Sequence, residues 1–144
     1  MSTVLSTSDY KKGWWWQMIS VLRAGGEGPS SRAEGTIVGD AWRDAVLPPT
    51  DGIAIGRVFF APGARTYWHR HESGQLLIVV AGEGFVADAD GAVRVVEGDM
   101  IWTPPGHRHW HGAAPNRFLL HTAIALGTTE WLEAVNDAEY SESQ

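Results

Sequence analysis

"GARTYWHRHESGQLLIVVAG", residues 63–82, is the stretch that decides the fold. His69 and His71 lie two residues apart. On a β-strand, residues i and i+2 point to the same face, so both imidazoles can reach one ion. Gln75 follows a short bend that can turn its side chain toward the same point, whereas Glu72 directly follows His71 and should face away. We therefore expect a strand that presents metal ligands, with Glu72 outside the ligand set.

The chain from Gly35 onward reads as short strands separated by turns. β-Branched and aromatic residues dominate, and turn signals recur about every 8–12 residues, which is the pattern of an antiparallel sandwich or barrel. "LPPTDG", residues 47–52, is expected to be one such turn, and Asp90–Gly91 a hairpin turn. Near the end, Thr129 is expected to cap a short helix with one apolar face, formed by Trp131, Leu132 and Val135.

The first part of the chain has a different composition. Residues 14–16 are three adjacent tryptophans, and a Gly/Ser/Pro-rich linker follows. We expect residues 1–34 to form an arm that packs on the main body or on a second subunit, and residues 35–144 to form the main domain. An arm of this kind and exposed barrel edges suggest a homodimer.

Composition limits the classes of function. The 144 residues suit one domain, and 11 Lys+Arg against 17 Asp+Glu give a net charge of -6, which argues against nucleic acid as a partner. Cysteine is absent, which excludes disulfides, thiolate zinc sites and a cysteine nucleophile. The apolar run near the N-terminus is too short to span a membrane and lacks a small-residue cleavage site, so we expect a soluble cytoplasmic protein with no membrane partner.

All six histidines lie between His69 and His121, which places the chemistry in that window. His109 is expected to be the third metal ligand beside His69 and His71, because several buried imidazoles in one barrel need a common reason. The turn before His107 should direct that side chain elsewhere. For His111 and His121 the sequence leaves two alternatives, a structural role or general acid/base chemistry.

Two motifs resemble those of the cupin family. Gly63, His69, His71, Gln75 and Gly82 match its first motif, with glutamine in the place of the usual glutamate. Gly98, Pro104, Gly106 and His109 match the second motif, and Ala113 stands where an asparagine is usual. The resemblance implies an all-β fold, a cupin-type antiparallel β-sandwich or barrel (jelly-roll), that holds one divalent metal ion on His69, His71, Gln75 and His109.

The glutamine makes the resemblance narrower. Small cupins that use glutamine as a ligand include manganese-dependent hydroxynitrile lyases and the metal-dependent cyclases of aromatic polyketide pathways, of the resistomycin cyclase type. The resemblance therefore implies a cyclase that closes a ring in a poly-β-ketone, which we favour from the sequence because of the arm, or a hydroxynitrile lyase. A non-catalytic cupin that binds a small molecule and, more weakly, a dioxygenase are the further alternatives.

An amide ligand changes the electrostatics of such a site. Three neutral imidazoles and a neutral amide leave the full charge of a divalent ion uncompensated, which favours Lewis-acid chemistry on a carbonyl or enolate oxygen. Zinc is favoured, with manganese or iron as alternatives. Large apolar side chains suit a cavity for an aromatic or polyketide substrate. The expected lining residues are Phe59, Trp68, Leu77, Phe85, Trp102 and Phe118.

Overall fold

The computed structural model describes residues 19–23 and 28–144. Its first six strands are β1 (Ser31–Arg32), β2 (Ile37–Val38), β3 (Ala41–Thr50), β4 (Ile53–Phe60), β5 (Arg65–Thr66) and β6 (His69–His71). The next six are β7 (Gln75–Asp88), β8 (Gly91–Val96), β9 (Met100–Thr103), β10 (Trp110–Ala113), β11 (Leu119–Leu126) and β12 (Thr129–Trp131). One helix follows in this part of the chain, α1 (Asp137–Glu142). The three adjacent tryptophans of the expected arm lie outside the described residues, and the division at residue 34 remains a prediction.

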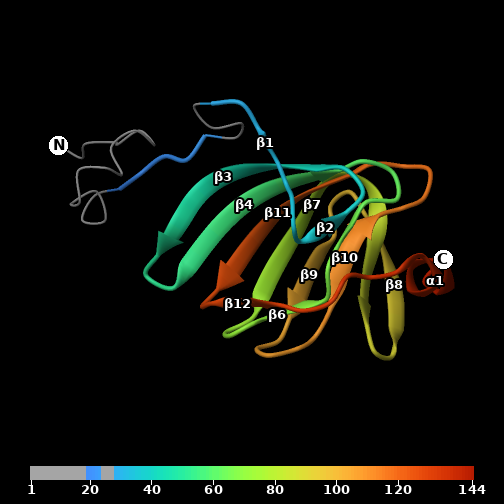
Figure 1. Cartoon of the computed structure of the whole chain (residues 1–144). Coiled ribbons are helices and arrows are strands. Elements are labelled where there is room, and N and C mark those ends of the chain that lie inside the picture. The colour runs from blue at the N-terminus through green and yellow to red at the C-terminus, as the bar shows by residue number, and fades with distance from the viewer. Residues whose placement is uncertain (1–18, 24–27) are drawn as a thin grey trace.

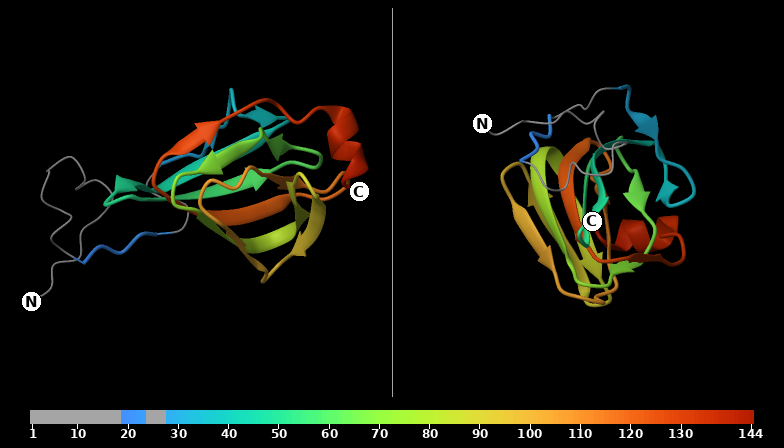
Figure 2. Two further views of the ribbon diagram at one scale, coloured as in Figure 1. Left: turned by 90° about the horizontal axis from the view of Figure 1, so that it is seen from below. Right: turned by 90° about the vertical axis from the view of Figure 1, so that its left-hand side faces the viewer.

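The strands form a curled antiparallel half-barrel (Figures 1 and 2). Within the described residues, ten strands make one sheet with the order β1-β3-β4-β11-β7-β10-β5-β2, and β8 and β9 also pair with β7. The remaining two, β6 and β12, pair with each other and run side by side along one edge of the half-barrel in Figure 1. The predicted all-β cupin-type fold with a short C-terminal helix is confirmed.

The long strand β7 joins the two halves of the curled sheet. Its first half pairs with β9 and β11, and its second half with β8 and β10. The register against β11 shifts between Leu120 and His121, a bulge that bends the ladder and re-aims the following side chain. His121 points inward from this position and is 1% exposed. The bulge therefore contributes directly to the position of an interior histidine.

Of two local predictions from the sequence, one is right in part and one is wrong. The turn expected in "LPPTDG" is confined to Asp51 and Gly52, whereas "LPPT" belongs to β3. Among the described residues β3 pairs beyond Arg43 only with β4, and prolines are tolerated on the open side of an edge strand. Thr129 does not cap a helix, because residues 129–131 pair with β6 as β12. The helix begins later, at a capping box in which Asn136 and Glu139 bond reciprocally to each other's backbone N–H groups.

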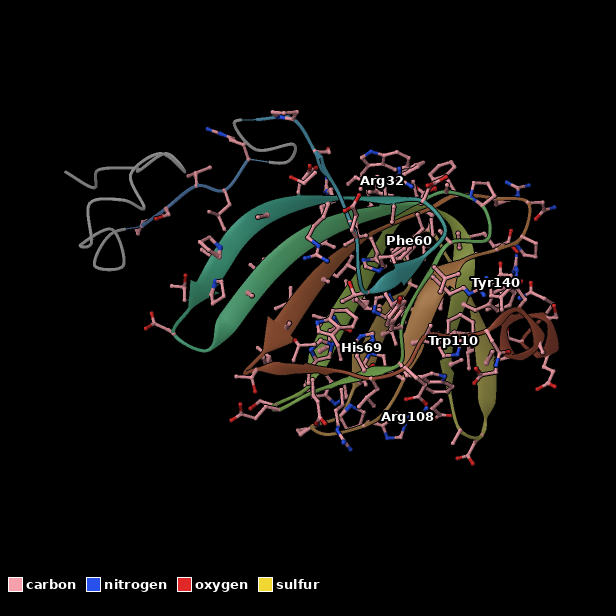
Figure 3. The ribbon with its side chains drawn as sticks, in the orientation of Figure 1. Arg32, Phe60, His69, Arg108, Trp110 and Tyr140 are labelled. Atoms are coloured by element: carbon pink, nitrogen blue, oxygen red, sulfur yellow. The ribbon has the colours of Figure 1, made fainter. Side chains whose placement is uncertain are left out.

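The C-terminal segment packs against the outside of the half-barrel. A buried cluster there contains Trp68, Phe85, Trp110 and Tyr140; Tyr140 belongs to α1, and the labelled Trp110 lies toward that helix in Figure 3. The Tyr140 hydroxyl donates to the Ala113 carbonyl at 2.7 Å. Close to β12, Trp68 N–H donates to the Glu133 carbonyl and its own carbonyl accepts from Leu132 N–H. The chain after β11 is thus attached to the strand that carries the first two histidines. In the described part of the chain, no helix is long and apolar enough to cross a membrane.

Candidate metal centre

The backbone brings His69, His71 and His109 together. His69 and His71 are the two ends of β6 and both are buried, which agrees with the two-residue alternation of a strand. His109 lies just before β10 and forms an isolated antiparallel bridge with His69, with N–H to carbonyl distances of 2.9 Å in both directions. One ring nitrogen from each of the three histidines lies within 4.8 Å of those of the other two, close enough for the group to hold a metal ion.

Gln75 enters the same centre from the start of β7. The turn between β6 and β7 requires Gly74, because its φ is +100° and a Cβ there would lie 2.8 Å from the Thr103 carbonyl oxygen. Gln75 is 4% exposed, and its Oε1 lies 3.2 Å from His109 Nε2. Two adjacent donors at bond lengths of about 2.1 Å from one ion are about 3 Å apart. Glu72 points elsewhere, as expected, because its carboxylate accepts hydrogen bonds from Thr128.

Each histidine of the group is fixed through its Nδ1 atom. His69 Nδ1 lies 2.8 Å from the Tyr67 carbonyl oxygen, and His109 Nδ1 lies 2.9 Å from the His107 carbonyl oxygen. His71 Nδ1 lies 2.9 Å from Thr129 Oγ1. A ring whose Nδ1–H donates keeps an unprotonated Nε2, which is the form that binds a metal. The side chain of His107 itself lies on the surface against Asp88, as the sequence suggested.

These residues fit the divalent ion that the donor set implies. His71 Nε2 is buried and has no hydrogen-bond partner within the described residues. An unpaired buried nitrogen costs free energy unless another group, such as a metal ion, binds its lone pair. An ion bound by His69, His71, His109 and Gln75 would remove that cost. The set has only nitrogen and amide oxygen donors, so it compensates none of the charge of the ion.

His111 and His121 form a second pair within the same interior. His121 Nε2 lies 3.0 Å from His111 Nδ1, and both rings are buried. Their outer nitrogens, His111 Nε2 and His121 Nδ1, have no hydrogen-bond partner among the described residues. The centroid of the His111 ring lies 5.2 Å from that of His69, so the pair adjoins the group formed by His69, His71 and His109.

Burial keeps these five imidazoles neutral. It is the first cause that lowers the pKa of His69 to about 2 and of His71 and His121 to about 4. The pKa values of His109 and His111 are lowered for the same first reason. Neighbouring imidazoles add to the effect on His69 and His111, since a second positive charge nearby would be repelled. Neutral rings are the state required both of metal ligands and of proton acceptors.

The histidines open onto a cavity of about 310 Å³. His69, His71, Gln75, His111 and His121 line it, and its other walls are mainly aliphatic. None of the six residues predicted to line a pocket belongs to this lining, although Trp102 lines a second cavity, of about 530 Å³, to which His109 also belongs. Their positions are the outer cluster near α1 (Trp68, Phe85), the core (Leu77) and exposed surface (Phe59, Trp102, Phe118).

Two residues of β12 belong to the site and were missed. Thr129 and Trp131 both line the cavity, and they face His71 and His69 directly across the β12–β6 ladder. The alternation of Thr129 and Trp131 around the charged Glu130 is a strand signal that could have indicated this.

Comparison with known proteins agrees with this geometry. The Cupin domain family matches residues 56–120. An (R)-mandelonitrile lyase from Granulicella tundricola is 42% identical, over 82% of this chain and 92% of that protein. This chain belongs to the cupin family.

Solved structures show the same fold. A cupin-like protein from Thermotoga maritima is 35% identical, with a TM-score of 0.74 over 77% of this chain and 90% of that one. The polyketide cyclase RemF from Streptomyces resistomycificus is 18% identical, with a TM-score of 0.56 over 70% of this chain and 76% of that one. The latter likeness concerns the fold alone. At a coarse level, the likeness to the lyase supports an enzyme of the cupin family, and its histidine group is able to hold a metal ion.

Thr129 should set the metal affinity through His71. Thr129→Val keeps the size of the side chain but removes the oxygen that faces His71 Nδ1, so the ring loses the hydrogen bond that orients its Nε2 toward the centre. We expect metal affinity to fall by about 10- to 100-fold, measured by competition with a chelator. Thr129→Ser restores the oxygen and should restore affinity; equal affinity in the wild type and the valine variant would contradict this role.

The metal-free protein should lose stability in acid. The unfolded chain protonates its histidines near the ordinary pKa of 6.5, whereas folded His71 and His121 remain neutral down to about pH 4. Over this interval the unfolded state binds more protons, so the free energy of unfolding falls as pH falls, and it levels off below the folded pKa values. Urea unfolding of chelator-treated protein between about pH 7 and pH 4 measures this.

A single substitution provides the control for this pH dependence. His121→Asn should reduce the proton uptake on unfolding by about one. A free energy of unfolding that stays constant over the interval would show that the imidazoles are not held neutral.

Proposed function

We propose that this protein is a metal-dependent hydroxynitrile lyase, which cleaves an α-hydroxynitrile into an aldehyde and hydrogen cyanide. The observation that carries the proposal is the His111–His121 pair, buried at an apolar cavity beside the His69, His71 and His109 group. The relative named (R)-mandelonitrile lyase, at 42% identity, supports it.

The reaction needs a group that takes one proton and returns another. The hydroxyl proton must leave the substrate oxygen, the C–CN bond breaks with its electron pair on cyanide, and cyanide must gain a proton. No electrons are exchanged with an outside group. A divalent ion on His69, His71, His109 and Gln75 would supply Lewis acidity toward the substrate oxygen.

The histidine pair can perform both proton transfers. Two neutral imidazoles carry two protons, and one of these lies in the hydrogen bond between His121 Nε2 and His111 Nδ1. The other proton is on one of the two outer nitrogens, so one end of the pair donates while the other end accepts. A proton accepted at the bare end shifts the shared proton and allows release at the far end.

Burial favours proton transfer through the histidine pair over a mechanism in which one histidine takes up the proton alone and becomes charged. Burial lowers the pKa of both His111 and His121, because an imidazolium at either ring would lose its solvation. Transfer through the pair avoids a lasting charge, because a proton enters at one end as another leaves. The unpartnered outer nitrogens, His111 Nε2 and His121 Nδ1, are the atoms assigned to these steps.

Ring closure of a poly-β-ketone, favoured from the sequence, now has less support. The cyclase neighbour is 18% identical and shares the fold alone. The cavity of about 310 Å³ lies near the lower end of the range for ligand pockets, about 300–1,000 Å³. This size suits a one-ring substrate better than an extended polyketide, and the cyclase becomes the second candidate.

The decisive assay uses mandelonitrile with metal-loaded protein. Benzaldehyde release, followed by absorbance in an acidic buffer that slows spontaneous decay, should be seen with the wild type. His121→Asn should lower kcat by about 10²- to 10⁴-fold while metal content stays unchanged, because His121 lies outside the metal-binding group. No release by the wild type would reject the lyase; turnover of a poly-β-ketone would then support the cyclase, and ligand binding without turnover a non-catalytic cupin.

Gln75→Glu tests the charge of the centre. The carboxylate would compensate one unit of the ion's charge, so metal affinity should rise while Lewis acidity toward the substrate oxygen falls. We expect kcat for mandelonitrile to fall at least about tenfold with the metal site fully occupied. Unchanged kcat at full occupancy would show that the neutral amide is not needed for catalysis.

A further inference from the structure

Trp131 stands where the metal-binding group meets the cavity. Its ring centroid lies 4.6 Å from that of His69, with an angle of 36° between the planes. It lines the cavity and is 41% exposed, so part of the indole is free to contact a ligand. The strand pairing fixes this position, because Trp131 directly faces His69 in the β12–β6 ladder.

The remaining walls offer a ligand little aromatic surface. Apart from the histidines, Phe60 and Trp131 are the aromatic side chains among the described lining residues. Phe60 is 0% exposed and packs against His111 and His121, with centroid distances of 6.0 and 5.2 Å, and in Figure 3 it lies inside the strands. The aliphatic members include Ile37, Leu47, Pro48, Ile55 and Val58. An aromatic contact with a ligand therefore falls to Trp131.

We propose that Trp131 determines specificity, selecting substrates whose reacting carbon carries a planar aromatic ring. Such a ring can stack on the indole while the oxygen of the same carbon faces the histidines. Aromatic pairs gain affinity beyond burial of equal area, by about two- to tenfold for one pair. A saturated ring of the same size gains only the affinity that comes from burying its apolar surface. This assignment rests on the proposed lyase function for the identity of the reacting group.

Two cyanohydrins that differ only in ring saturation test the assignment. Mandelonitrile and the cyanohydrin of cyclohexanecarbaldehyde have the same number of carbons. The wild type should prefer mandelonitrile in kcat/KM, and Trp131→Leu should lower that preference about two- to tenfold, mainly by raising KM for mandelonitrile. Trp131→Phe should keep most of the preference. An equal loss for both substrates in Trp131→Leu would overturn the assignment and leave the lyase intact.

Equilibrium binding supplies a readout that does not depend on turnover or on bound metal. Benzyl alcohol and cyclohexylmethanol are titrated calorimetrically into chelator-treated wild-type protein and the same two variants. A preference for benzyl alcohol that Trp131→Leu removes and Trp131→Phe retains supports the role of Trp131, even if no cyanohydrin is cleaved and the proposed function fails. Equal binding of both alcohols by the wild type would overturn it.

Discussion

The burial of five imidazoles close to one another is the constraint on which the rest of this structure depends. His69, His71, His109, His111 and His121 are each at most 4% exposed, and no carboxylate is among the described residues that line the cavity. Without an acid to pair with, a buried imidazolium would be unstable, so the rings must be neutral. Neutral rings have lone pairs to satisfy, and either a metal ion or a further imidazole can do so. The structure divides them accordingly, into a group of three and a hydrogen-bonded pair.

The backbone keeps these two groups of rings distinct. Each ring of the group of three has its Nδ1 next to an oxygen, of the Tyr67 carbonyl, the His107 carbonyl or the Thr129 hydroxyl. In the other group, His111 Nδ1 faces no such oxygen, and it forms a hydrogen bond with His121 Nε2 instead. An oxygen acceptor fixes a tautomer, whereas a second imidazole leaves two tautomers open. A fixed tautomer suits a ligand, and an exchangeable one suits proton transfer.

The sequence predicted what depends on local geometry. Alternation on a strand placed His69 and His71 on one face, and the short bend before Gln75 brought that side chain back to them. The cavity walls could not be predicted in this way, because large side chains fit equally well inside a barrel, on its outer face or in a core. Which face Phe59 or Trp68 takes depends on registers between strands that are far apart in the sequence. β3, β4 and β11 supply the aliphatic wall instead.

The helix predicted to start at Thr129 illustrates the same limit in a way that matters for function. Trp131, Leu132 and Val135 have helical spacing, which competes with the short strand signal of residues 129–131. The pairing with β6 decides otherwise, and β6 lies 58 residues before Thr129 at the His71 contact. As a helix, this segment would have offered a cap and an apolar face. As β12, it places the hydroxyl of Thr129 at His71 and the indole of Trp131 at His69, and both histidines are predicted metal ligands. The strand that this distant pairing selects is therefore the one that links the His69, His71 and His109 group to the cavity.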